Sequence, residues 1–207
     1  MTEAEWRRTT DPGAMLDFLH GRSSGRKLRL FACACCRPLF TKKDLYHGAL
    51  DVAEEVAEGK APRRRVRELE LYATMAMEDG GPLTWSVSFA LAPDLPKNGL
   101  NREFTDAAAG LRKGVSEEED AARFVGLLRC VFGNPFRPVT FSPSWLTPTA
   151  VSLAEAIYTD RAFDRLPILA DALQDAGCEN AAILGHCRGD GVHVRGCWVV
   201  DGVLGKG

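Results

Sequence analysis

The sequence predicts a mostly α-helical protein that forms a single multi-helix domain, residues 1–207, with roughly nine or ten helices. Two observations lead to this fold class: residues that begin and end helices recur along the chain, and apolar residues follow them at intervals of three and four. The sequence lacks the regular alternation of apolar and polar residues that marks a series of β-strands. We expect two helical halves, residues 1–79 and 116–207, separated by an irregular segment, residues 80–115, that contains paired glycines and several prolines.

Five helices are predicted in the N-terminal half. Thr2 and Glu5 begin the first as a capping box, in which the threonine hydroxyl and the glutamate carboxylate each accept a hydrogen bond from the other residue's backbone N–H. The later helices are expected to begin at Asp11-Pro12, Ser24, Thr41 and Pro62. Gly59 has the place of a helix-ending glycine after the fourth.

Further helices are predicted through the irregular segment and the C-terminal half. We expect a short helix around Thr84–Leu91 and a helical stretch at 102–113. A second capping box, Ser116 with Glu119, begins a helix over 117–132. The later helices are expected at 148–160, 166–176 and 180–186. The last segment, HVRGCWVVDGVLG, contains β-forming residues, but its helical context favours a helix.

The composition is typical of a globular protein in water, with 45% hydrophobic and 26% charged residues. The formal net charge of −2 provides no global basic field to attract nucleic acid or a membrane. The first residues, MTEAEWRRTTDPG, lack the apolar core of a signal peptide, and no run of about 18 apolar residues occurs. We therefore expect a cytoplasmic protein without membrane association, whose seven cysteines are reduced.

Three of the cysteines cluster in LRLFACACCRPLF, residues 28–40. At 100° per residue, Cys35 falls on the apolar stripe of this predicted helix and is expected in the core. Cys33 and Cys36 lie three residues apart and share a flank about 80–140° away from that stripe. Another element must cover that flank.

A second concentration of thiols and imidazoles lies in HCRGDGVHVRGC, residues 186–197. Zinc normally takes four such ligands. If the last segment is helical, His193 and Cys197 lie one turn apart on one face, and they could complete a zinc site with Cys33 and Cys36. His186 and Cys187 are the alternates, although adjacent residues rarely both point at one ion. The interpretation we favour is that the clustered cysteines are buried packing residues and that no cofactor is bound, with zinc as the alternative.

The same residues leave a cysteine-dependent enzyme or redox protein open as another alternative. Cys187 could act as a nucleophile with His186 or His193 as its base. Arg188 and Arg195 would then lower its pKa. The Cys33/Cys36 pair is the other candidate for redox chemistry.

One basic patch stands out, at PRRRVRE: Arg63, Arg64, Arg65 and Arg67. Because no aromatic residues are interleaved with these arginines, a solvated helix face is the favoured interpretation and nucleic-acid binding the alternative. The sequence contains no HExxH, Walker, GxSxG or Rossmann glycine motif.

Several stretches together resemble a family of uncharacterised planctomycete proteins. They are RKLRLFACACCR, FGNPFRPV, WLTPTAV, ILADALQDAGC and HCRGDGVHVRGCWVVD. The resemblance begins with MTEAEW, is clearest over 132–205 and is weakest over 80–115. It implies that the cysteine helix and the C-terminal segment belong to one architecture in a bacterial, cytoplasmic protein, and it supplies no catalytic residues.

These observations favour a non-enzymatic interaction or scaffold module. The sequence contains no catalytic motif, and many of its residues serve helix capping and packing. The expected partner is another protein.

Overall fold

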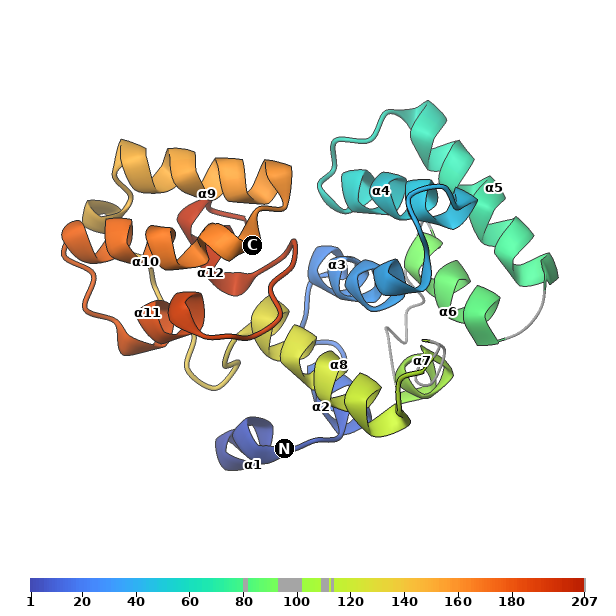
Figure 1. Ribbon diagram of the computed structural model, residues 1–207, viewed down its shortest axis with the longest axis horizontal. Helices are drawn as coiled ribbons and strands as arrows, with labels where there is room; N and C mark the ends of the chain where they lie inside the picture. The colour runs from blue at the N-terminus through green and yellow to red at the C-terminus, as the bar shows by residue number, and fades with distance from the viewer. Residues whose placement is uncertain (80–81, 93–101, 109–111, 113, 207) are drawn as a thin grey trace. The chain divides into compact units, whose positions relative to one another are not determined.

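The computed structural model describes residues 1–79, 82–92, 102–108, 112 and 114–206. Within these ranges every regular element is helical, as Figure 1 shows, and there is no β-strand. The prediction of a mostly α-helical protein is therefore confirmed. The described residues contain twelve α-helices, a few more than the nine or ten expected. Two of the twelve, Arg102–Ala108 and Trp198–Val203, are short and lie in stretches whose sequences gave weak or ambiguous signals.

The chain divides into two compact units, Met1–Leu128 and Arg129–Gly207. The boundary between the units lies within helix α8 (Glu117–Phe132), because the last turn of that helix belongs to the second core. The expectation of a single domain with its irregular part at 80–115 stays a prediction. Cys130, in that turn, is a core residue of the second unit.

The first unit contains helices α1 to α7 and most of α8. Their bounds are α1 Glu3–Arg8, α2 Pro12–Leu19, α3 Gly25–Cys36, α4 Leu45–Ala57, α5 Arg63–Asp79, α6 Pro82–Leu91 and α7 Arg102–Ala108, with a 3-10 turn at Arg37–Leu39. The cysteine helix α3 packs against α4 and α6, and α5 also packs against α4 and α6. Cys33, Cys35 and Cys36 are all buried, so the predicted burial of Cys35 is confirmed.

Most of the predicted helix starts are confirmed by the hydrogen bonds of their caps. Both capping boxes form, at Thr2 with Glu5 and at Ser116 with Glu119. The prediction that Thr41 caps the fourth helix is wrong. The Asp44 carboxylate accepts hydrogen bonds from both the backbone N–H and the hydroxyl of Thr41, and α4 begins after Asp44.

Two arginines satisfy buried polar groups inside the first unit. Arg37, just after α3, binds the buried carboxylate of Glu54 at 2.7 Å. Arg123 donates to the carbonyl oxygen of Ala34 at 2.6 Å, in the last turn of α3. The carbonyl groups of a helix's last turn lack partners within the helix. Arg123 therefore caps the cysteine helix from α8.

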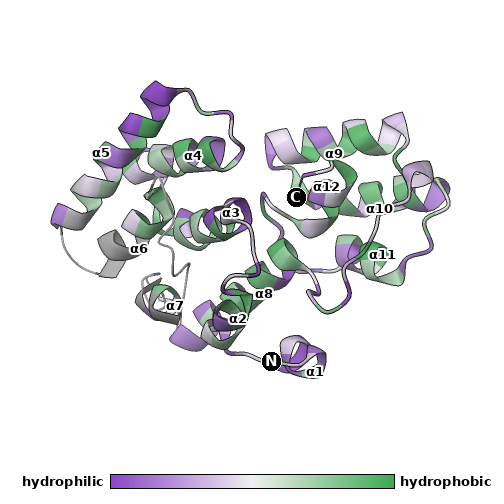
Figure 2. Cartoon of the chain, turned by 180° about the vertical axis from the view of Figure 1, so that it is seen from behind, coloured by the Kyte–Doolittle hydropathy of each residue, from purple (hydrophilic) through white to green (hydrophobic). Residues whose placement is uncertain are grey.

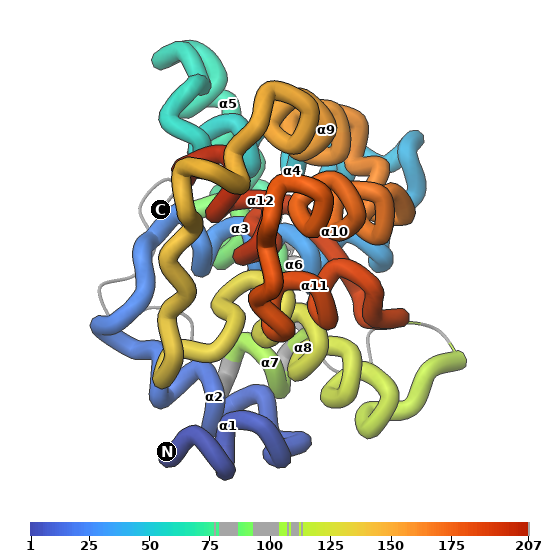
Figure 3. The backbone as a smooth tube through the Cα atoms, turned by 90° about the vertical axis from the view of Figure 1, so that its left-hand side faces the viewer, coloured from blue at the N-terminus to red at the C-terminus, as the bar shows by residue number. Residues whose placement is uncertain are grey.

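The second unit contains three helices and the short C-terminal helix. They are α9 Pro148–Asp160, α10 Leu166–Asp175 and α11 Ala181–Arg188, followed by α12 Trp198–Val203, with 3-10 turns at Pro143–Trp145 and Phe163–Arg165. Helix α10 packs against α9 and α11, and α12 packs against α9, an order that Figure 3 lets the reader follow. Four of the seven cysteines lie in this unit's apolar core: Cys130, Cys178, Cys187 and Cys197.

Two glycines permit the closest packing in this unit. A side chain at Gly202, in α12, would overlap the ring of Phe141. A Cβ at Gly133, whose φ is +62°, would lie 3.0 Å from Cγ of Trp198. Phe141 and Trp198 meet edge to face, with ring centroids 6.3 Å apart. Aromatic packing therefore fixes both ends of α12.

No helix among the described residues combines the length and the apolar character needed to cross a membrane.

The packing at Gly202 yields a stability prediction. Gly202→Ala should lower the free energy of unfolding by about 1–3 kcal/mol, because the added methyl group must displace the Phe141 ring. Gly185→Ala, in α11 of the same unit, is the matched control, since nothing lies within 4 Å of its added Cβ. That control should gain about 0.5–1 kcal/mol. Urea unfolding followed by circular dichroism measures both values, and equal effects of the two substitutions would contradict the assigned contact.

Candidate metal centre

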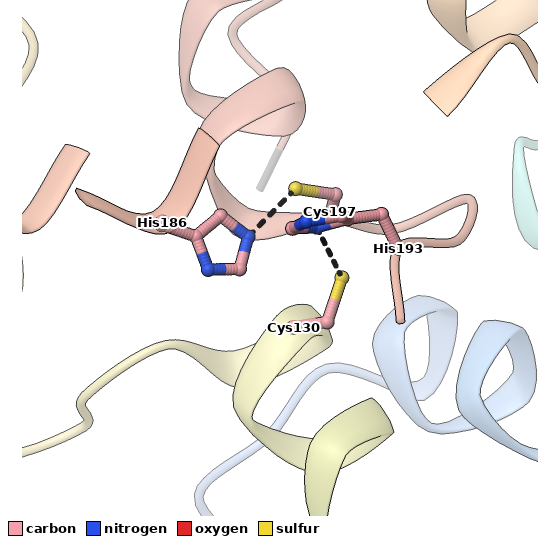
Figure 4. Close-up of side chains that lie close together, drawn as sticks. All are labelled: Cys130, His186, His193 and Cys197. Carbon is pink, nitrogen blue, oxygen red and sulfur yellow. Dashed lines mark hydrogen bonds between the residues drawn. The ribbon is translucent and has the colours of Figure 1, made fainter. Parts of the chain in front are cut away.

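Four side chains of the second unit converge on one point, as Figure 4 shows. They are Cys130, His186, His193 and Cys197, and one ligand atom from each lies within 4.8 Å of those of the other three. This set, the Cys/His group, contains two buried cysteines and two partly buried histidines. The group could hold a metal ion.

The first two members sit on helices that end near the group. Cys130 lies in the last turn of α8, which Gly133 ends in a left-handed conformation. His186 lies in the last turn of α11. The side chain of Asn180 fixes the start of α11 by accepting hydrogen bonds from the backbone of Ala182 and Ile183. Because α11 has only eight residues, the cap that fixes its first turn also fixes the position of His186 in its last turn.

The last two members sit on the segment that precedes α12. The backbone N–H of Cys197 donates to the carbonyl of Val194 at 3.0 Å and closes a turn. Gly196 has φ +90° there, a conformation that side chains rarely adopt. The expectation of one helix through both His193 and Cys197 is therefore wrong. A turn brings them together, and Cys197 is the N-cap residue of α12.

Two contacts within the group lie close to the ligand spacing of a tetrahedral site. Nε2 of His186 lies 3.2 Å from Sγ of Cys197, and Nδ1 of His193 lies 3.7 Å from Sγ of Cys130. Zinc bonds of about 2.3 Å to sulfur and about 2.0–2.1 Å to nitrogen place the ligand atoms about 3.3–3.8 Å from one another. The ligand atoms that are up to 4.8 Å apart would have to move about an ångström closer to one another to bind one zinc ion tetrahedrally.

Aromatic contacts hold the two imidazoles in place. The rings of His186 and His193 meet nearly perpendicularly, at 87°, with centroids 4.8 Å apart. The indole of Trp198 packs on His186 at 5.4 Å. Gly133 leaves the room for that indole.

One nitrogen of the group lacks a protein partner. Nε2 of His193 is buried and has no hydrogen-bond partner among the described residues. A neutral imidazole has one donor and one acceptor nitrogen, and leaving a buried one unmet costs free energy. A cation held among the four residues would satisfy whichever ring nitrogen faces it.

The electrostatics of the group favour a thiolate at Cys197. Burial, the largest single effect, raises the pKa of this thiol. Hydrogen bonds from Cys130, His186 and His193 together outweigh burial, so that the pKa of Cys197 lies well below its usual range. Cysteine binds metals as the thiolate. The neighbours of Cys197 therefore prepare it to act as a ligand.

The Cys/His group overlaps the predicted ligands in part. It contains His193 and Cys197 from the predicted quartet, and the alternate His186. Its fourth member, Cys130, was missed. Cys33 and Cys36 belong to the first unit, where both are buried, and their pairing with the C-terminal donors stays a prediction.

A signal for Cys130 was present in the sequence. At 100° per residue it lies about 160–200° away from Leu128, Ala121 and Phe132 on the predicted apolar stripe of its helix. A thiol on the far side of an amphipathic helix needs a second element to cover it. Cys33 and Cys36 were noted in the sequence for the same reason, because they lie off the apolar stripe of their helix.

Cys187 does not point into the group, although it is adjacent to His186. It is buried in the core with Ile183. Burial raises the pKa of its thiol, and the opposing effect of Arg188 is smaller. Arg188 itself binds Asp171 at 2.6 Å. These surroundings disfavour the nucleophilic role considered for Cys187.

The basic patch on α5 is partly neutralised by acidic neighbours. Arg65 binds Glu68 at 3.0 Å and Glu55 at 3.4 Å. Arg63, Arg64 and Arg67 are exposed. This arrangement is typical of a solvated helix face.

In comparisons with known proteins, no family model, no curated protein and no solved structure matches the chain. The resemblance to planctomycete proteins stays a prediction.

Burial of all seven thiols yields a prediction about reactivity. Every cysteine is buried and free of disulfides, so the native protein should react only slowly with a chromogenic disulfide reagent at neutral pH. The same protein in guanidinium chloride with a chelator should release seven equivalents of the chromophore. A single thiol that reacts within seconds in the native protein would contradict this expectation and favour a cysteine-dependent activity.

Proposed function

We propose that residues 129–207 form a zinc-stabilised helical domain and that the protein works as a non-enzymatic interaction module. The observation that supports the zinc site is the convergence of Cys130, His186, His193 and Cys197, with ligand atoms within 4.8 Å of one another. Two thiolates and two imidazoles form one of the donor sets of structural zinc sites.

The chemistry of the donors supports zinc over other common divalent cations. Calcium and magnesium prefer oxygen ligands, and this group offers none. Sulfur and nitrogen donors in a tetrahedral set are typical of zinc. Two negatively charged thiolates would balance the charge of the divalent ion, which makes its burial among apolar residues acceptable.

The arrangement supports a structural role for the ion. Catalytic zinc sites keep one position open for water or substrate, whereas structural sites use four protein ligands. All four ligands here come from side chains, and both cysteines are about 1% exposed or less. The ion would therefore tie α8, α11 and the start of α12 together.

An interaction module, with another protein as its partner, agrees best with the remaining chemistry of the chain. The candidate nucleophile Cys187 is buried and its pKa is raised. The arginine patch shares α5 with acidic side chains, which disfavours nucleic acid.

Metal analysis tests the proposal directly. Untagged protein purified without chelator should contain about one equivalent of zinc, and an excess of a strong chelator should lower the melting temperature, because the binding free energy of a structural zinc is folding free energy. Mass spectrometry of the metal content and thermal unfolding provide the two measurements. Zinc below about a tenth of an equivalent, with stability unchanged in chelator, would overturn the zinc site.

Ligand substitutions test which cysteines bind the ion. Cys130→Ser should weaken zinc binding more than about 100-fold, since loss of a direct ligand should cost more than loss of a residue that only hydrogen-bonds to a ligand. Cys178→Ser is the matched control, because Cys178 is buried in the same core but lies outside the Cys/His group.

The double variant Cys33→Ala/Cys36→Ala examines the quartet predicted from the sequence. Competition with a chromogenic chelator measures each affinity. Full zinc affinity in Cys130→Ser together with its loss in the double variant would assign the site to Cys33 and Cys36 and would refute the role of Cys130.

A further inference from the structure

Helix α5 exposes a continuous face that the described residues of its own unit leave uncovered. Its buried side carries Leu69, Ala73 and Ala76, which pack within the first unit. On the opposite side, Leu71 is 58% exposed and Met75 is 38% exposed. These are two of the large exposed apolar side chains among the described residues, and they lie one turn apart.

Charged residues flank these two apolar side chains along the same face. At 100° per residue, five side chains fall within about 80° of arc, centred on Leu71 and about 165° away from the buried side. The five residues, called here the α5 face, are Arg64, Arg67, Leu71, Met75 and Glu78. All five are exposed. In Figure 2 both ends of α5 are coloured as hydrophilic.

The α5 face is complementary to itself in the antiparallel direction. Arg64 and Glu78 lie seven residues before and after Leu71, and Arg67 and Met75 lie four residues before and after it. If two copies of α5 pack antiparallel with Leu71 facing Leu71, each Arg64 meets the Glu78 of the other copy. A twofold axis requires this kind of self-complementary surface.

The charged residues at the two ends of α5 have the signs that its helix dipole disfavours. The dipole favours acidic residues in the first turn and basic residues in the last turn. Helix α5 has neither, and instead begins with arginines and carries Glu78 in its last turn. This distribution is unfavourable for an isolated helix. Across an antiparallel pair, each of these charges would face a charge of opposite sign.

We propose that the α5 face is a homodimer interface, on which a second copy of this chain packs its own α5 antiparallel about Leu71. The contact involves one helix of 17 residues per copy, about 25 Å long. An interface of this size lies at the small end of specific contacts, so the dimer should be weak, with a dissociation constant of about 10–500 μM. It involves the first unit alone and does not depend on the zinc site.

Charge reversal provides the sharpest test, with the zinc-saturated 207-residue chain in analytical ultracentrifugation over about 5 μM to 1 mM. The wild type should shift from monomer toward dimer as its concentration rises. Arg64→Glu places two glutamates opposite each other, and Glu78→Arg places two arginines opposite each other. Each variant alone should therefore associate at least about tenfold more weakly. An equimolar mixture of the two variants should recover the wild-type association, because both ion pairs then form between the unlike copies.

Two exposed residues outside the α5 face provide matched controls. Glu155→Arg, on α9, makes the same charge change as Glu78→Arg and should leave association unchanged. Leu71→Glu should abolish association, whereas Leu45→Glu, at a leucine that is 49% exposed on α4, should not. Circular dichroism checks that each variant remains folded.

A wild type that stays monomeric to 1 mM would overturn the proposal. It would equally be overturned if the charge variants associate like the wild type, or if their mixture fails to recover association.

Discussion

The second unit depends on one constraint, which is that four polar ligand atoms meet inside an apolar core. Cys130, His186, His193 and Cys197 come from the end of α8, the end of α11 and the turn before α12. Each of these segments must end where it does for the atoms to meet. Gly133, Asn180 and Gly196 determine those ends through a left-handed turn, a helix cap and a tight turn. The backbone of this unit is therefore organised around the point where the side chains converge.

The core around the Cys/His group would favour a bound cation. A buried imidazole nitrogen without a partner and a thiol with a lowered pKa would both be costly among apolar side chains. A divalent cation would neutralise the thiolate and would accept the lone pair of the one ring nitrogen of His193 that faces it. Trp198 packs on the imidazole of His186, and Phe141 packs on Trp198 in turn. Low polarity around the ion would strengthen its attraction to the thiolates.

The local part of this structure could be predicted from the sequence, and the long-range part could not. Capping boxes and the bounds of α8 follow from neighbouring residues, and both were correct. The start of α4 was predicted wrongly at Thr41, because the residues after Thr41 form a turn, in which the Asp44 carboxylate binds back to Thr41, before the helix begins. His193 and Cys197 were found by their local concentration. Cys130 was missed because it approaches them from a segment 63 residues away in sequence.

The chain contains seven buried thiols, and the neighbours of a buried thiol determine whether its pKa is raised or lowered. Desolvation raises the pKa of Cys33, Cys35 and Cys187, and raises that of Cys36 to about 12, so these four stay neutral and pack as small apolar side chains. Cys197 is as deeply buried as they are, but two imidazoles and a second thiol surround it. The difference lies in the neighbours, since burial is common to all five. Histidine next to a buried thiol can stabilise a thiolate, and a thiolate sealed from solvent is better suited to hold an ion than to attack a substrate.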